Sequence, residues 1–96
     1  MIINFKSKCA HDIYDGINSK LSRQIPRELH AKIRRLLDQI NAAPTIDTLK
    51  MPPGNKLEKL KGNFQSFWSL RINNQWRIIF RWINTDALDV DIVDYH

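Results

Sequence analysis

The chain has 96 residues, of which 43% are hydrophobic and 26% are charged, with only 3 Gly and 4 Pro. This length closes a single hydrophobic core, so we expect one domain over residues 1–96. The composition excludes a disordered or fibrous protein. The 15 Lys and Arg residues against 10 Asp and Glu leave a net charge of +5, which points to a polyanionic partner such as nucleic acid.

Cysteine content and the length of apolar runs bear on the compartment. Cys9 is the only cysteine of the sequence, which excludes an intrachain disulfide and leaves no ligand set for a structural zinc. No apolar run approaches the roughly 18 residues that cross a bilayer, and residues 1–8 lack the apolar stretch of a signal peptide. We therefore expect a soluble, cytoplasmic protein with no membrane partner.

The first half of the chain predicts one strand and two helices. Residues 1–5 form a short β-prone run, and residues 8–15 fit a short helix. Over residues 26–42 apolar side chains recur at helical spacing on one face, and they are Leu29, Ile33, Leu36, Leu37 and Ile40. This second helix is expected to end before Pro44, because proline disfavours the helical conformation of the preceding residue.

From residue 57 onward the apolar period changes to two, which predicts four strands. The first strand is short and covers residues 57–61. The last covers residues 87–93 and alternates apolar with acidic residues, with Leu88 on the apolar side. Two longer strands lie between them, and their apolar face is formed by Trp68, Leu70, Ile72, Trp76, Ile78, Phe80 and Trp82.

Apolar pairing predicts the register of the two long strands. A three-residue loop pairs Leu70 with Ile78, and the same register places Arg71 directly opposite Arg77. A two-residue turn pairs Leu70 with Arg77 and is rejected. The sum is an α+β fold of order β-α-α-β-β-β-β, a curved, mostly antiparallel sheet with two helices packed on one face. The other face carries Arg71, Arg77 and Arg81, and we name it the arginine face.

Like charges directly across a sheet are destabilising, so the facing Arg71 and Arg77 indicate that an anion binds there. Arg81 lies on the same side, and Lys61 lies on the preceding strand. The phosphates of RNA or DNA are the obvious candidates. The alternative is a surface network in which carboxylates of neighbouring strands neutralise the cluster. Those carboxylates belong to Glu58, Asp89 and Asp91.

The chain ends Asp94-Tyr95-His96. Terminal residues are usually frayed, but here the preceding strand holds the tail close to the sheet, where Tyr95 and His96 can meet the arginines. A histidine has an ordinary pKa of about 6.5, so beside a phosphate it suits a general acid. His11 and His30 fall on the two helices, where ordinary surface or core-edge positions are expected.

Aromatic and acidic residues allow two further sites to be considered. Once the other large aromatic residues are assigned to the core, Phe64 and Phe67 near a loop are left for base stacking. A D-x-D-x-x-D run has the residue types for Mg²⁺, but strand alternation separates Asp94 from Asp89 and Asp91. We therefore expect no metal site and no cofactor.

Three stretches of the sequence resemble one family, and they are PPGNKLEKLKGN, WSLRINNQWRIIFRW and the terminal VDIVDYH. The family is the HigB branch of the RelE-like toxins of bacterial type II toxin-antitoxin systems, and the resemblance extends in order over essentially the whole chain. It implies a ribosome-dependent endoribonuclease, an mRNA interferase, that cuts the messenger in the decoding site. It also implies a cognate HigA-like antitoxin with a helix-turn-helix domain. The toxin is then expected to associate with operator DNA only through this antitoxin.

The same resemblance implies a metal-free mechanism in which the messenger's own 2′-hydroxyl attacks the adjacent phosphate. Lys61 and Arg77 match the family's phosphate-stabilising cations, and Gln75 falls where a polar side chain contacts the codon in some members. The terminal catalytic group of the family is matched by Asp94, Tyr95 and His96.

One position departs from the pattern. Some members carry a histidine in the strand leading into L-K-G, where this sequence has Glu58. Glu58 is either a substitute base, with a pKa raised by desolvation, or an ionised partner of the neighbouring cations, which allows a weak enzyme. Two other classes stay open. One is a non-catalytic translation inhibitor, and the other is a module that uses the arginine face to bind antitoxin or nucleic acid.

Overall fold

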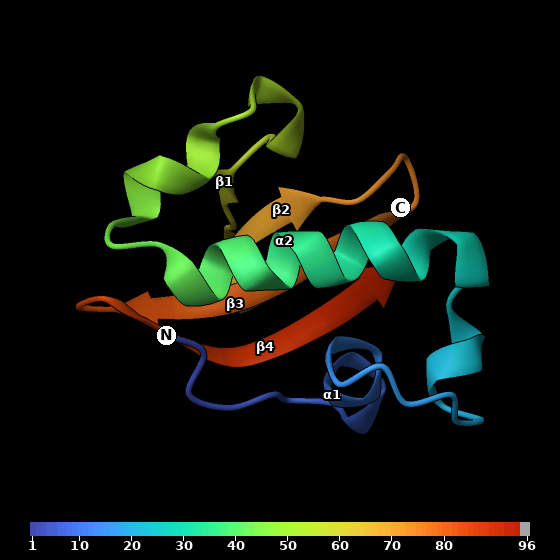
Figure 1. Cartoon of the computed structure of the whole chain (residues 1–96). Helices are drawn as coiled ribbons and strands as arrows, with labels where there is room; N and C mark the ends of the chain where they lie inside the picture. The colour runs from blue at the N-terminus through green and yellow to red at the C-terminus, as the bar shows by residue number, and fades with distance from the viewer. Residues whose placement is uncertain (95–96) are drawn as a thin grey trace.

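The computed structural model describes residues 1–94, which form two α-helices and a four-stranded antiparallel sheet (Figure 1). The elements are α1 (Lys8–Tyr14), α2 (His30–Ala42), β1 (Glu58–Lys59), β2 (Phe67–Arg71), β3 (Trp76–Ile83) and β4 (Asp86–Asp94). The strands lie in the order β1-β2-β3-β4. Figure 1 shows α2 lying along one face of the sheet, with α1 near β4. The expected α+β class is confirmed.

Local interactions and neighbouring residues define the ends of the two helices. Ser7 caps α1, since its Oγ accepts a hydrogen bond from the backbone N–H of Ala10 at 3.2 Å. Gly16 follows α1 with φ +73°, a conformation that favours glycine. The α-helical part of α2 begins later than residue 26, because a 3₁₀ turn over Arg27–Leu29 precedes it. The helix ends before Pro44, as expected.

The opening segment differs from the expected strand. It runs parallel to β4 and forms two isolated bridges, in which Ile2 pairs with Ala87 and Phe5 pairs with Val90. Backbone hydrogen bonds of 2.8 to 3.2 Å accompany these bridges. A continuous ladder does not form, because β4 is irregular between the two paired residues. Residues 1–5 are therefore an extended edge segment rather than a strand.

A bulge in β4 corrects the predicted alternation of the last strand. Ile79 pairs with Asp91 and Arg81 with Leu88, which leaves Asp89 and Val90 together opposite Phe80. Asp89 takes up the extra residue with φ +52°. The shift turns Leu88 out of the core and places Ala87 in it.

One core lies between the helices and the sheet, and α2 contributes Ile33, Leu36, Leu37 and Ile40 to it. The predicted strand residues Leu70, Ile72, Ile78 and Phe80 are fully buried beneath the helices. Leu29, Trp68 and Trp76 were expected in the core as well, but they are only partly buried and pack against its rim. Within residues 1–94, no helix is both long and apolar enough to cross a membrane.

Candidate functional site

The two long strands pair as predicted, and this register builds the arginine face. Arg71 on β2 lies directly opposite Arg77 on β3, next to the pair formed by Leu70 and Ile78. Ile72 N–H donates to the carbonyl oxygen of Trp76 at 3.0 Å, and this bond closes a loop of the three residues 73–75. Two cations are thereby held side by side on the sheet surface that the helices leave uncovered.

Arg77 is largely enclosed, with 13% of its side chain exposed against 34% for Arg81. Its Nη1 donates to Ser69 Oγ at 3.2 Å and lies 3.8 Å from Oε2 of Glu58. Ser69 is fully buried and pairs with Glu58 across β1 and β2, so all three side chains lie on one face. Glu58 is thus placed as an ionic partner of Arg77, which agrees with the second of the two roles considered for it.

Arg81 forms a closer ion pair at the other end of the face. Its Nε lies 2.9 Å from Oδ2 of Asp89, while Asn4 Nδ2 donates to Oδ1 of the same carboxylate at 2.8 Å. The hydrogen bond from Asn4, and then the interactions with Arg81, hold the pKa of Asp89 below its ordinary value. The expected neutralising network exists here, whereas the Asp91 carboxylate accepts a hydrogen bond from the backbone N–H of Ile92.

Arg71 has a different environment. Its Nη2 donates to Oδ1 of Asn74, in the turn that follows its own strand. Among residues 1–94, the ion pairs of the arginine face involve Arg77 and Arg81, and Arg71 has no carboxylate partner. Arg71 is therefore the cation of this face best placed to meet an incoming anion.

Lys61 lies beyond the end of β1, because the expected strand over residues 57–61 is shortened to two residues. Lys61 is extended, and Gly62 then turns the chain with φ +69°. Lys61 and Glu58 line one hollow of about 380 Å³ together with Lys59, Leu60 and Phe64. Glu58 connects this hollow to Arg77, because it lines the hollow and also forms the ion pair with Arg77.

One of the hollow's lining residues, Phe64, belongs to an aromatic pair with Phe67. Phe64 is 43% exposed, and its ring centroid lies 5.9 Å from that of Phe67 in an edge-on arrangement. The Lys6 ammonium lies 5.8 Å from the Phe67 centroid. The two stacking candidates therefore lie together among cations.

The third group of predicted residues lies at the end of β4. Asp94 pairs with Trp76, the residue before Arg77, and its Oδ2 accepts a hydrogen bond from Gln75 Nε2 at 3.1 Å. Gln75, the predicted codon-contacting residue, thus contacts Asp94, the first residue of the predicted terminal catalytic group. Tyr95 and His96 lie outside the described residues.

Two positioning residues were not singled out from the sequence, namely Ser69 and Asn4. Ser69 carried a usable signal, because a small polar residue alternating with Arg71 in a strand must share the arginine face. Nothing in the sequence around Asn4 indicates its role, because its partner Asp89 lies 85 residues away along the chain. In the part of the chain from Met1 to Asp94, no three His, Cys, Asp or Glu residues come together as a possible metal site.

The chain is similar to known toxins over most of its length. The model of a family described as the RelE-like toxin of the type II toxin-antitoxin system HigB matches residues 3–96. Toxin HigB-1 of Vibrio cholerae serotype O1 is 36% identical over 89 residues, which are 93% of this chain and 92% of that toxin. Endoribonuclease HigB of Proteus vulgaris is 33% identical over 97 residues, which are 100% of this chain and 100% of that protein.

The fold has solved counterparts. The YoeB-YefM complex from Staphylococcus aureus matches with a TM-score of 0.62 and 26% identity, over 100% of this chain and 95% of that chain. The YoeB/ParE toxin from Agrobacterium tumefaciens, at 21% identity and a TM-score of 0.51, shares the fold over 94% of this chain and 93% of its own. With the family model spanning nearly the whole sequence, the chain belongs to the RelE-like toxins of the type II toxin-antitoxin system HigB.

Proposed function

We propose that this toxin is an endoribonuclease that cuts messenger RNA during translation. The observation that carries the proposal is the facing pair Arg71 and Arg77, which concentrates positive charge on the sheet face opposite to the helices. Glu58 offsets the charge of Arg77, but Arg71 has no carboxylate partner among residues 1–94, so an arriving anion lowers the repulsion between the two arginines. Arg is well suited to the planar, two-pronged binding of phosphate oxygens. The name of the Proteus vulgaris relative, an endoribonuclease, supports the same activity.

The chemistry requires no metal. The 2′-hydroxyl of the messenger gives up its proton to water or to a basic group as its oxygen attacks the neighbouring phosphorus. The bond from phosphorus to the 5′-oxygen breaks, and a proton is delivered to that oxygen. The products are a 2′,3′-cyclic phosphate and a free 5′-hydroxyl. Arg77 and Lys61 would stabilise the negative charge that grows on the phosphate oxygens, and His96 would supply the proton to the leaving oxygen.

Several neighbours would prepare these groups. Glu58 and Ser69 orient the Arg77 guanidinium, since both contact its Nη1. Asp94 and Tyr95 would position His96 at the end of β4. We assign Glu58 to this orienting role and not to the general base, because its carboxylate faces a cation.

The messenger would be bound by groups around the same face. Arg71 and Arg81 would contact phosphates, and Gln75 would contact a base of the codon. Phe64 offers an exposed ring beside Lys61, where a base can stack.

The partners follow from this activity. A ribosome would present the messenger in its decoding site, which places the toxin in the cytoplasm. A HigA-like antitoxin with a helix-turn-helix domain would hold the toxin inactive and alone contact operator DNA. The Staphylococcus aureus counterpart was solved as a toxin-antitoxin complex, which supports an antitoxin partner.

The deciding experiment is translation of a defined messenger with purified ribosomes, followed by primer extension and analysis of the new ends. We expect cuts within codons, dependence on ribosomes, and ends that carry 2′,3′-cyclic phosphate or its 3′-phosphate hydrolysis product. Arrest of translation without cuts would show a non-catalytic inhibitor. Ends with 3′-hydroxyl and 5′-phosphate would contradict attack by the 2′-hydroxyl.

A further inference from the structure

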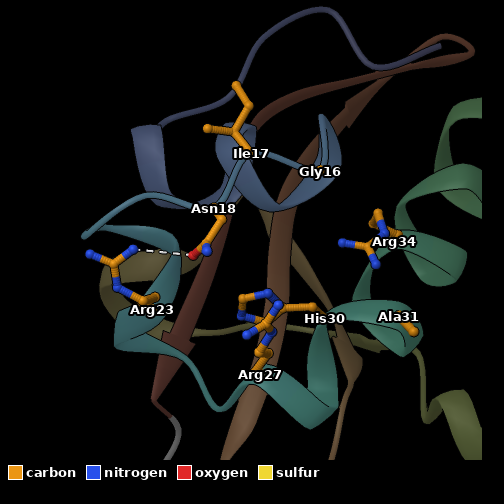
Figure 2. A pocket seen from close by; sticks show the side chains of 8 residues that line it. All are labelled: Gly16, Ile17, Asn18, Arg23, Arg27, His30, Ala31 and Arg34. Atoms are coloured by element: carbon orange, nitrogen blue, oxygen red, sulfur yellow. Dashed lines mark hydrogen bonds between the residues drawn. The ribbon is translucent and has the colours of Figure 1, made fainter.

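A second pocket lies away from the arginine face, between the segment after α1 and the start of α2 (Figure 2). Its volume is about 240 Å³, and its lining residues are Gly16, Ile17, Asn18, Arg23, Arg27, His30, Ala31 and Arg34. We name it the cationic pocket. The helices that frame it cover the sheet face opposite to the arginine face, so the two basic surfaces lie on different sides of the molecule.

The charge of the cationic pocket is one-sided. Its lining contains three arginines and one histidine but no carboxylate. Arg23, Arg27 and Arg34 form no ion pair within residues 1–94. Three like charges around one hollow repel each other and focus a positive potential into it, which an arriving anion relieves.

The pocket is also partly preorganised. Arg23 Nη1 donates to Asn18 Oδ1 at 3.1 Å, and Arg34 Nη1 donates to the carbonyl oxygen of Ile13 at 3.4 Å. Each bond uses one of the five N–H donors of its guanidinium and leaves the others for a ligand. In the view of Figure 2, Arg23 and Arg34 stand on opposite sides of the pocket, with Arg27 between them.

We infer that the cationic pocket binds backbone phosphates of a folded RNA other than the messenger, which on the proposed function is ribosomal RNA. Arginines spread over three elements suit consecutive phosphates of a backbone, since each phosphate brings one negative charge. A single acidic side chain of a protein partner would satisfy one of these arginines and leave the others unneutralised. The arginine face then holds the messenger while the opposite side of the toxin contacts the ribosome.

The test uses purified small ribosomal subunits without messenger, so that the substrate of the arginine face is missing. The double variant Arg27→Gln/Arg34→Gln should weaken subunit binding about 10-fold or more and lower the dependence of affinity on salt by about two phosphate contacts. The matched control is Lys20→Gln/Arg35→Gln, which removes the same charge from exposed positions outside the pocket lining. The control should stay within about twofold of the unaltered toxin.

Two readouts separate this inference from the proposed function. With messenger present, the double variant should need about 10-fold more ribosomes for half-maximal cleavage, while cutting at the same phosphates. If the unaltered toxin cuts nothing, the proposed function fails, yet subunit binding still tests the pocket. Arg27→Gln alone guards against misfolding, because the Arg27 side chain donates no hydrogen bond within residues 1–94, and it should also weaken binding.

Three results would overturn the inference. One is equal loss of subunit binding in the pocket variant and in the control variant, which would indicate a general effect of charge. Another is no loss in either. The third is weaker binding of the antitoxin with unchanged binding of the subunit, which would make the pocket a site for an acidic peptide.

Discussion

Glu58 and Arg77 contact each other across an intervening strand, with 3.8 Å between Oε2 and Nη1. Glu58 lies on β1 and Arg77 on β3, and Ser69 of β2 lies beneath both as a hydrogen-bond partner of the guanidinium. The pair joins three strands on one face. This contact supports the orienting role proposed for Glu58, at the position where some family members carry a histidine.

Glu58→Gln is therefore expected to retain cleavage to within about threefold, well short of the roughly 100-fold loss typical of a missing general base. Single-turnover cleavage of a ribosome-bound messenger measures this rate. Asp47→Asn, which neutralises an exposed carboxylate paired only with Lys50, is the matched control. A 100-fold loss with unchanged binding would instead make Glu58 the base.

Arg77→Ala should damage both binding and turnover, and we expect cleavage to fall by about 100-fold or more. The physical reason is that a cation on the phosphate also stabilises the charge added in the transition state. Arg77→Lys keeps the charge but loses the planar fork, so it should recover binding more than turnover. Equal recovery of both would show that charge alone matters at this position.

Deletion of His96 should leave ribosome binding nearly intact and reduce cleavage by about 100-fold, the usual scale for losing an acid-base group. Affinity is measured by sedimentation with ribosomes and turnover by primer extension. The idea fails if the shortened chain still cuts at the full rate.

The core makes a prediction about stability. Ile33 is fully buried in α2, so Ile33→Ala should lower the free energy of unfolding by about 2 to 5 kcal/mol. Ile83→Ala is the matched control, since Ile83 is 48% exposed and should cost less than about 1 kcal/mol. Urea denaturation measures both. Equal losses at the two sites would contradict the assignment of the core.

Asp12 predicts how stability depends on pH. Its side chain is fully buried, and the hydrogen bond from Ser19 Oγ, at 2.7 Å, is the main cause that lowers its pKa, while burial acts in the opposite direction. A lowered folded pKa means that the stabilisation is complete above the unfolded pKa of about 3.9 and is lost as the pH falls through the folded value. Urea denaturation at pH 7 and pH 3 should show this loss, and Asp12→Asn should reduce the difference. If Asp12→Asn shows the same difference in stability between pH 7 and pH 3, other groups cause the pH dependence.

Much of the candidate site was predictable because its parts are local in sequence. Strand alternation placed Arg71, Arg77 and Arg81 on one side, and apolar pairing selected the loop that sets Arg71 against Arg77. The ion pairs were harder. Glu58 was recognised only as one of two possibilities, since a pattern cannot show whether a carboxylate meets a cation or an apolar wall.

Periodicity within one or two neighbouring elements was enough to predict both helices, the register of the two long strands and the arginine face. The bulge at Asp89 could not be predicted in this way, because regular alternation continues through that part of the sequence while Asn4, 85 residues away, bonds to the displaced residue. The cationic pocket has the same origin. Its arginines are separated in the sequence and come to line one hollow only when the segment after α1 folds against the start of α2.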